Sequence, residues 1–331
     1  MPRPSEDALI ATYFAPLAGP GSFGLRDDAA VLTYGSGQDI VATKDMLIAG
    51  VHFFADDPPG AVARKALRVN LSDLAAKGAE PRGFLLGLAL PGDWTPEWLA
   101  GFSQGLGEDA LAYACPLLGG DTVKTNGPLA ISITALGAVP ARKIVLRAGV
   151  AADDLLYVTG TIGDAALGLR YRAGAAPDIE WAKCVSQTDA AYLAGRYLLP
   201  QPRLGLRDTL RAHAHAAMDI SDGLAGDLAK LLQLTGMTAE VSAAAVPLSK
   251  AARTLARQWP FLLETIFTGG DDYELLCAVP PPEAAAFEAG AIAAGILVHK
   301  IGTAKPGDAP PVFKDKRGQD LVFAQPSFRH F

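Results

Sequence analysis

Hydrophobic and polar positions in residues 1–140 follow two different periods. Short apolar or alternating runs at residues 39–43, 83–90 and 129–139 predict β-strands, in which successive side chains point to opposite faces. Between them, residues 61–77 and 98–113 carry apolar side chains three and four positions apart, which is the spacing of one helix face. This part of the chain is therefore predicted to contain both strands and helices.

The alternation restarts after a looser, basic and glycine-containing connection at residues 142–154. We expect the domain boundary there, with an N-terminal domain over residues 1–145 and a C-terminal domain over residues 146–331. The predicted fold class is α/β with mixed α+β character, in two domains. After the boundary we expect strands at 155–159, 216–220, 240–241 and 273–279, and helices at 164–173, 188–199, 224–235 and 282–294.

The length and composition of the chain are consistent with two hydrophobic cores, and its net charge limits the kind of ligand that it can bind. The chain has 331 residues, half of them hydrophobic, and its 19% of charged residues exclude a disordered polar chain. The net charge of −6 argues against a broad nucleic-acid-binding surface. We therefore expect no nucleic-acid partner and a local site for any phosphate ligand.

No apolar run approaches the roughly 18 residues that a membrane span requires, and the first residues lack a basic region followed by an apolar run. We therefore expect a cytoplasmic protein with no membrane partner. Cys115, Cys184 and Cys277 are widely spaced and form no C-x-x-C pair, so we expect reduced cysteines and neither a disulfide framework nor a zinc site.

Aspartates beside small residues, at the ends of apolar runs, are the unusual chemical feature. Glycine at such positions lets the backbone approach a ligand closely, and carboxylates with nearby hydroxyls are the oxygen donors that Mg²⁺ prefers. As a set they predict a polynuclear Mg²⁺ and phosphate centre. The segments are Asp27-Asp28, Thr43-Lys44-Asp45, Ser72-Asp73, Gly119-Gly120-Asp121-Thr122, Gly163-Asp164, Asp219-Ile220-Ser221-Asp222-Gly223 and Gly269-Gly270-Asp271-Asp272.

Each segment taken alone also has a structural interpretation as a turn or a helix cap. Asp73 falls on the apolar face of the predicted helix at 61–77, where an unpaired carboxylate is costly. A metal ion would compensate it, and so would an ion pair with Arg68, five residues before it, or with Lys77, four residues after it.

Two further positions have two interpretations each. Asp222 precedes the helix at 224–235 and is explained by an N-cap alone, although the same helix start can bind phosphate with the Ser221 hydroxyl beside it. His52 follows the predicted strand end at Asp45, where it is either a phosphate donor or a surface-loop histidine. The chain has no P-loop and no protein-kinase motifs, so a nucleotide must be held in another way.

The order and spacing of the motifs resemble the thiamine-monophosphate kinase family, in the superfamily that includes aminoimidazole ribonucleotide synthetase. The resemblance spans nearly the whole chain. Besides the aspartate segments, it rests on Asp45-Met46-Leu47, Gly50-Val51-His52-Phe53, Val69-Asn70-Leu71-Ser72-Asp73, Val158-Thr159-Gly160-Thr161-Ile162-Gly163-Asp164, Gly269-Gly270-Asp271-Asp272-Tyr273-Glu274-Leu275 and His330-Phe331.

The resemblance implies a kinase that uses ATP and several Mg²⁺ ions to phosphorylate thiamine monophosphate by in-line transfer, with no catalytic residue apart from the metal ligands. It implies Mg²⁺ ligands at Asp28, Thr43, Asp45, Asp73, Asp121, Asp219 and Asp222. It implies ATP contacts at Gly120, Asp121, Arg147 and Ser221, and thiamine phosphate contacts at His52, Asp271 and Phe328.

The implied architecture is a homodimer. In it, the N-terminal mixed sheets pair into a barrel across the two copies, and a C-terminal mixed sheet is flanked by helices. Arg26 and Lys44 stand where the family usually has Gly and Ser or Thr, and Lys44 brings a positive charge in place of one oxygen ligand. Three alternatives stay open: another enzyme of the superfamily such as the purine-pathway synthetase, a metal-dependent phosphatase, and a Ca²⁺-stabilised binding module.

Overall fold

The computed structural model describes residues 9–19, 35–325 and 327, which form two compact units. The first unit comprises Met1–Leu74 and Ala79–Lys143, and the second comprises Ala75–Gly78 and Ile144–Phe331. Asp28 and Phe328 lie outside the described residues. Within the described ranges, no helix combines the length and the apolar character needed to cross a membrane.

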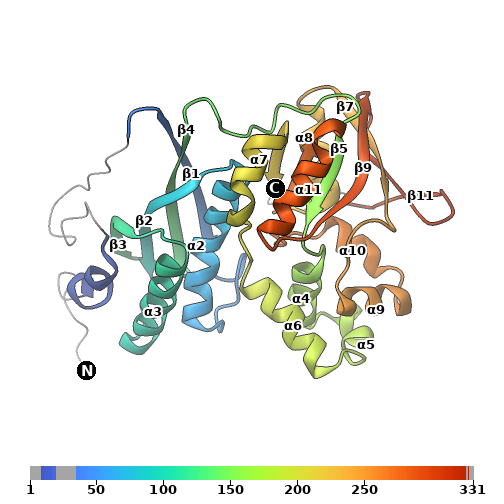
Figure 1. Ribbon diagram of the computed structural model, residues 1–331. Helices are drawn as coiled ribbons and strands as arrows, with labels where there is room; N and C mark the ends of the chain where they lie inside the picture. Colours follow the sequence, from blue (N-terminus) through green and yellow to red (C-terminus); the bar gives the residue numbers. More distant parts are fainter. Residues whose placement is uncertain (1–8, 20–34, 326, 328–331) are drawn as a thin grey trace. The chain divides into compact units, whose positions relative to one another are not determined.

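The first unit is built on a four-stranded sheet with the order β1-β4-β2-β3 (Figure 1). The pairs β1/β4 and β4/β2 are antiparallel, and β2/β3 is parallel. Helices α2 and α3 pack against one face of this sheet (Figure 1). The bounds are β1 (Gln38–Ile48), α2 (Pro59–Ala76), β2 (Glu80–Leu90), α3 (Pro96–Ala112), β3 (Leu117–Lys124) and β4 (Ala130–Pro140), after the short helical turns η1 (Ile10–Phe14) and η2 (Ala15–Leu17).

The two faces of this sheet differ in burial. On the helix-covered face, Leu47, Ile133 and Leu86 are at most 4% exposed. On the other face, Met46 and Leu85 are 53% and 40% exposed. Because side chains alternate along a strand, each polar residue of β1 is assigned to one of these faces by its position alone.

The second unit contains a seven-stranded mixed sheet with the order β11-β10-β7-β9-β5-β8-β6. Its strands are β5 (Leu155–Thr159), β6 (Ala216–Asp219), β7 (Met237–Ser242), β8 (Leu275–Val279), β9 (Val298–Pro306), β10 (Val312–Lys314) and β11 (Asp320–Leu321). Its helices are α4 (Asp164–Ala173), α5 (Ile179–Ala182), α6 (Gln187–Leu198), α7 (Arg207–His213), α8 (Leu224–Gln233), α9 (Lys250–Gln258), α10 (Leu262–Thr268) and α11 (Ala284–Ala293), with the short turns η4 (Ala176–Asp178), η5 (Leu204–Leu206) and η6 (Pro281–Glu283).

Helices cover both faces of the second sheet. Leu156 and Val158 of β5 join the buried apolar cluster that contains Leu228 of α8. Tyr157, between them, packs on Phe287 of α11, with ring centroids 5.2 Å apart. Figure 1 shows helices beside this sheet, and the alternation of packing partners along β5 confirms a mixed sheet flanked by helices.

Three strands of this sheet have their carboxyl ends on the same side. β8 pairs antiparallel with both β5 and β6, and β9 pairs antiparallel with both β5 and β7. Strands β5, β6 and β7 therefore run in the same direction, and the loops that follow them lie at the same end of the sheet, beyond the carboxyl ends of these strands.

Candidate active site

In the first unit, Thr43 and Asp45 point from β1 toward helix α2, where they meet Asp73. The Thr43 hydroxyl donates a hydrogen bond to the Asp73 carboxylate. The backbone N–H of Asp45 donates to Oδ1 of Asn70 at 3.1 Å, and the Asn70 amide donates to the Ala66 carbonyl at 3.0 Å. The strand and the helix thus hold two carboxylates and a hydroxyl together.

Burial, with the nearby charge of Asp73, raises the pKa of Asp45 to about 6. The structure holds the two carboxyl groups close together, where like charges repel each other. Two carboxylates and a hydroxyl are hard oxygen donors that fit Mg²⁺, which completes its shell with water and phosphate oxygens. Within the described ranges, no three His, Cys, Asp or Glu side chains form a complete ion-binding group.

An ion pair between Asp73 and Arg68 is ruled out as the explanation for Asp73. Arg68 binds Asp109 of α3 instead, with Nε–Oδ2 and Nη2–Oδ1 distances of 2.5 and 2.9 Å. Lys77, the other candidate, donates to the Ala217 carbonyl at 2.9 Å. Arg68 lies five positions before Asp73, a spacing that places the two side chains on different sides of a helix, and Arg68 points to α3.

The expected strand end at Asp45 was wrong. β1 continues to Ile48, so Thr43 and Asp45 lie inside a strand. The polar Lys44-Asp45 pair broke the apolar pattern from which the shorter strand was inferred. In the folded unit, Asp45 lies on the inner face, where the Asn70 side chain accepts a hydrogen bond from its backbone N–H.

His52 lies in a tight turn after β1. Its Nδ1 accepts a hydrogen bond from the Ile48 N–H at 3.1 Å, and its carbonyl accepts one from Lys65 at 2.9 Å. Gly50 forms the turn with φ +83°, a conformation that favours glycine. With Nδ1 acting as an acceptor, the neutral ring carries its proton on Nε2, which is then a donor for a ligand.

Asp121 lies on β3, at the opposite edge of the sheet from Asp45. Across the sheet, Asp121 of β3 pairs with Gly87 of β2, and Gly87 pairs with Ser132 of β4. Ser132 in turn pairs with Met46 of β1. Three strand spacings place β1 and β3 about 14 Å apart along the sheet. Asp121 also faces the open side with Met46, so the sheet of one chain does not bring it to Asp45.

Lys44 shares the open face with Asp121. It alternates with Thr43 and Asp45, and its side chain is exposed. The positive charge of Lys44 therefore acts on the open face of the sheet, away from the carboxylates that face α2.

Gly120 allows β3 to pack closely against β2. A Cβ atom at this position would lie 1.9 Å from the Leu86 carbonyl oxygen, so a side chain is excluded. This close approach explains Gly120 without a ligand, and its contact with ATP stays a prediction.

In the second unit, the loop after β6 and the loop before β8 hold Asp219, Ser221 and Asp271 together. The backbone N–H of Asp271 donates to the Ser221 carbonyl at 2.9 Å, and that of Tyr273 donates to the Ile220 carbonyl at 2.8 Å. Asp219 is the last residue of β6 and is 4% exposed. These bonds extend the β6/β8 pairing and place the three polar residues at one edge of the sheet.

Asp271 adopts a backbone conformation that non-glycine residues rarely use, with φ +71°. The preceding Gly270 is needed because a Cβ there would lie 2.3 Å from the Ser221 carbonyl oxygen. Strained backbone held by close packing is common at ligand sites. The conformation of this loop therefore fits the predicted substrate role of Asp271.

Sequence reasoning assigned no role to Asp272, which the structure shows to be fully buried. Its Oδ2 accepts the Gly163 N–H at 2.8 Å, and its Oδ1 has no hydrogen-bond partner among the described residues. Burial raises its pKa well above the ordinary value for aspartate. Through this hydrogen bond Asp272 connects the loop before β8 to the start of α4. The only sequence signal for a role of Asp272 was its position as the second residue of the Asp271-Asp272 pair.

The N-cap interpretation of Asp222 was wrong. The residue before α8 is Gly223, with φ +109°, and no side chain caps this helix start. The Asp222 carboxylate pairs with Lys230 at 2.5 Å, and Lys230 also pairs with Asp227 at 2.9 Å. A spacing of eight residues along the helix brings Lys230 back over the loop.

Arg147 is exposed and belongs to the second unit. The Leu146 carbonyl accepts the Ala217 N–H at 3.1 Å, which places Arg147 alongside β6. The predicted site residues thus form two described groups. Thr43, Asp45, His52, Asp73, Gly120 and Asp121 are in the first unit, and Arg147, Asp219, Ser221, Asp222 and Asp271 are in the second.

Asn70 is a site residue that the sequence analysis missed. Its amide holds the backbone of Asp45 from the helix side. The available signal was its position three residues before Asp73, which puts both on the same helix face.

Comparison with known proteins places the chain in a class. Residues 26–139 match the family described as AIR synthase related protein, N-terminal domain, and residues 151–314 match AIR synthase related protein, C-terminal domain. Together with the two mixed α/β units, these matches define an AIR synthase-related protein.

The relatives narrow this class further. The thiamine-monophosphate kinases of Caulobacter vibrioides and Salmonella typhimurium are 42% and 37% identical to it, over 99% and 97% of this chain and 91% and 99% of theirs. The crystal structure of the thiamine-monophosphate kinase from Stenotrophomonas maltophilia has a TM-score of 0.79 at 35% identity, covering 90% of this chain and 91% of that one. The chain belongs to the thiamine-monophosphate kinase family and is an enzyme of the phosphotransferase class.

A further similar structure was solved with an ATP analogue and TMP bound. It is described as AaThiL complexed with AMPPCP and TMP, and it has a TM-score of 0.76 at 28% identity, over 94% of this chain and 97% of that one.

Proposed function

We propose that this protein transfers the γ-phosphoryl group of ATP to thiamine monophosphate, giving thiamine diphosphate and ADP. The observation that carries the proposal is the Thr43, Asp45 and Asp73 group, in a chain that belongs to the thiamine-monophosphate kinase family. A relative that binds TMP together with AMPPCP, an ATP analogue, supports both substrates.

In this reaction an oxygen of the thiamine phosphate attacks the γ-phosphorus of ATP. A new P–O bond forms, and the bond to the β-phosphate oxygen breaks with its electron pair leaving on ADP. A phosphate monoester has a second pKa of about 6, so the nucleophile is already an anion at neutral pH. The protein therefore needs to supply charge compensation and alignment more than a general base.

Asp45, Asp73 and Thr43 would hold Mg²⁺ in the first unit, and Asp219 and Asp222 would hold it in the second, with Asp28 and Asp121 as further ligands. Bound Mg²⁺ would neutralise the charge on the phosphate oxygens of the two anionic substrates. Burial first, and then the charge of Asp73, raise the pKa of Asp45, and a divalent ion between the two carboxylates would offset both effects.

The remaining residues bind and orient the substrates. His52 would donate from Nε2 to the phosphate of thiamine monophosphate, since its Nδ1 is held by Ile48. Asp271 would face the cationic thiazolium ring, and Phe328 would contact the ring system. Gly120, Arg147 and Ser221 would contact ATP, with Arg147 and the Ser221 hydroxyl as donors to its phosphates.

We also propose that two copies associate through the open face of the first sheet. Ile40, Met46, Leu85 and Val123 on this face are between 40% and 55% exposed. Among the described residues, helices cover only the other face of this sheet, and apolar side chains exposed on an uncovered sheet face indicate an interface. Pairing with a second copy would bury them, close the two sheets into a barrel and enclose Asp121, which lies on the same face.

The test is an assay of the purified protein with Mg-ATP and thiamine monophosphate. Thiamine diphosphate and ADP should form in equal amounts, and omission of thiamine monophosphate should stop ADP formation. Phosphate release from ATP alone would instead favour the metal-dependent phosphatase, and absence of thiamine diphosphate would overturn the proposal.

A further inference from the structure

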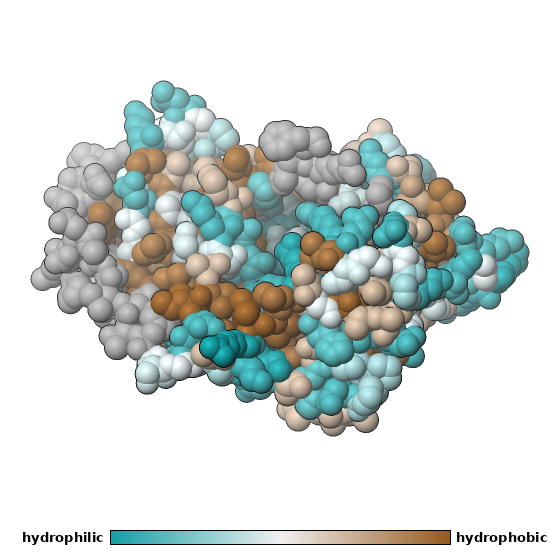
Figure 2. Space-filling view, turned by 90° about the horizontal axis from the view of Figure 1, so that it is seen from above, coloured by the Kyte–Doolittle hydropathy of each residue, from teal (hydrophilic) through white to brown (hydrophobic). Residues whose placement is uncertain are grey.

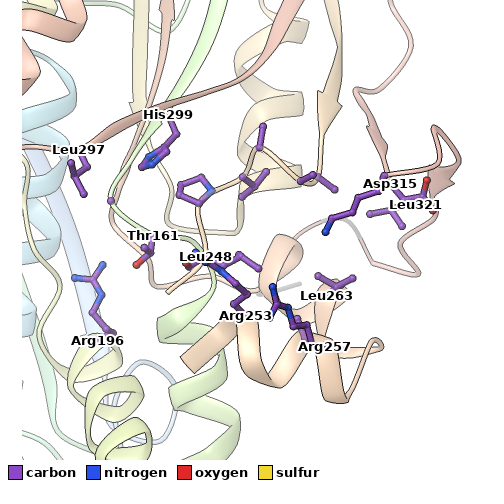
Figure 3. Close-up of a pocket in the computed structure, with 18 of the residues that line it drawn as sticks. Thr161, Arg196, Leu248, Arg253, Arg257, Leu263, Leu297, His299, Asp315 and Leu321 are labelled. Atoms are coloured by element: carbon purple, nitrogen blue, oxygen red, sulfur yellow. Dashed lines mark hydrogen bonds between the residues drawn. The ribbon is translucent and has the colours of Figure 1, made fainter. Parts of the chain in front are cut away.

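A cavity of about 1090 Å³ lies in the second unit, beside the loops that follow β5 and β7 (Figure 3). Its walls include Gly160 and Thr161 after β5, residues 243–248 after β7, and one face of α9. Asp219, Ser221, Asp222 and Asp271 are not among the described residues that line it. Its volume is slightly above the usual range of roughly 300–1,000 Å³ for small-molecule sites.

The lining is strongly basic. Asp315 is the single carboxylate among the described lining residues, and its Oδ1 already accepts the N–H groups of Arg317 and Gln319, both at 2.8 Å. In a chain of net charge −6, this is a local concentration of positive charge. The cationic lining residues are Arg196, Arg203, Arg253, Arg257, Lys316 and Arg317.

Two of these arginines are held in place by one buried carboxylate. Glu274 is fully buried, and its Oε1 accepts from Arg196 at 2.8 Å while its Oε2 accepts from Arg203 at 2.6 Å. Thr159 donates to the same carboxylate at 2.7 Å. One negative charge between two guanidinium groups leaves a net positive charge on a rigid wall.

The opposite side of the cavity is supplied by α9. Arg253 and Arg257 are four residues apart, so both project from the same helix face, and Figure 3 shows them beside Leu248 and Leu263. Lys316 and Arg317 come from the turn between β10 and β11, and this hairpin forms a hydrophilic end of the unit in Figure 2.

The cavity also has an apolar part and fixed hydroxyl groups. Leu248, Leu263 and Leu297 contribute apolar surface. Thr161 and Tyr192 donate to Asp164 at 2.6 and 2.9 Å, which fixes their positions at the wall. A ligand that fits this lining combines several negative charges with an apolar or ring portion.

We propose that this cavity binds a small organic di- or triphosphate directly through its arginines, without Mg²⁺. A guanidinium group can donate two parallel hydrogen bonds to the oxygens of one phosphate, and the opposite charges of the two groups strengthen these bonds. The aspartate groups of the proposed kinase site behave in the opposite way, because carboxylates repel phosphates unless a divalent ion lies between them. This second site goes beyond the proposed kinase reaction and takes no part in its chemistry.

The test is calorimetric titration of the full-length protein with ADP in EDTA, and separately with inorganic pyrophosphate. ADP should bind at one site per chain without metal, and rising salt should weaken the binding. Pyrophosphate should bind more weakly because it lacks the apolar portion. No ADP binding in EDTA at millimolar concentration would overturn the proposal.

Two matched variants locate the site. Arg257→Gln should weaken ADP binding in EDTA at least fivefold, and Arg253→Gln with Arg257→Gln should weaken it further. Lys250→Gln, on the same helix but outside the lining, removes the same charge and should leave the affinity unchanged. Equal affinities for Arg257→Gln and Lys250→Gln would place the ADP elsewhere.

The titration is independent of turnover. Binding in EDTA with no kinase activity would count against the proposed function alone. Kinase activity with no metal-free binding would count against the cavity alone.

Discussion

The Thr43 hydroxyl donates a hydrogen bond to the carboxylate of Asp73, across the interface between β1 and α2. The two residues are 30 positions apart in the chain, and this contact brings Asp73 next to Asp45. Thr43, Asp45 and Asp73 thus form one group, and we expect substitutions of Asp73 and Asp45 to change different properties, namely activity and the pH dependence of stability.

Asp73→Asn should lower kcat by about 100-fold or more at saturating Mg²⁺ and ATP, because a neutral amide is a poor Mg²⁺ ligand. The fold should persist, since Asn still accepts the Thr43 hydrogen bond. Steady-state kinetics and a thermal melt check both points. Asp93→Asn, an exposed loop residue of the same unit, is the control. Full activity of Asp73→Asn would remove this residue from the site.

Asp45 should make the metal-free protein less stable as the pH rises. Its pKa is about 6 in the folded state against 3.8 as the ordinary value, so the folded state binds more protons between these two pH values. Stability from this group therefore falls as the pH rises through that window, by about 1–3 kcal/mol. Asp45→Asn should abolish the loss.

Urea unfolding in EDTA at pH 4 and pH 7 tests this difference. Asp45→Asn should be the more stable protein at pH 7, and the gap should shrink at pH 4. Mg²⁺ should stabilise the wild type more than the variant. An equal gap at both pH values would mean that the pKa of Asp45 is not raised in the folded protein.

His52→Ala should raise the KM for thiamine monophosphate more than the KM for ATP, because we propose that its ring donates to the substrate phosphate. Initial rates with each substrate varied in turn give the two values. The reverse pattern would assign His52 to the nucleotide.

Met46→Asp should convert the proposed dimer into monomers, since a charge would be buried in the interface. Sedimentation at tens of micromolar protein should show the change. Leu111→Asp is the control, because Leu111 is 85% exposed and lies on α3, away from the open sheet face. A monomeric wild type would contradict the dimer outright.

Local sequence signals predicted the regular elements well where turns delimit them. The strand at 155–159 and the helix at 164–173 match β5 and α4 to the residue. Gly163 and Gly174 bound that helix with φ of +83° and +61°, conformations in which glycine is favoured.

The same signals failed where the conformation or the partner of a residue depends on another element of the fold. β3 was not predicted, because its two central glycines are poor strand formers, and they are tolerated only because the strand packs tightly against β2. Asp222 has the position of a cap, but Lys230 binds it instead.

The sequence by itself determined the period of each element and the family, because hydrophobic spacing and motif order are written along the chain. It also determined which residue types can bind magnesium and phosphate. Only the tertiary structure decided that Asp73 meets Thr43 and not Arg68, that Lys44 and Asp121 face away from Asp45, and that six cations gather around one cavity. Those outcomes depend on which faces of distant elements pack together, and that choice is made by burial of the whole core.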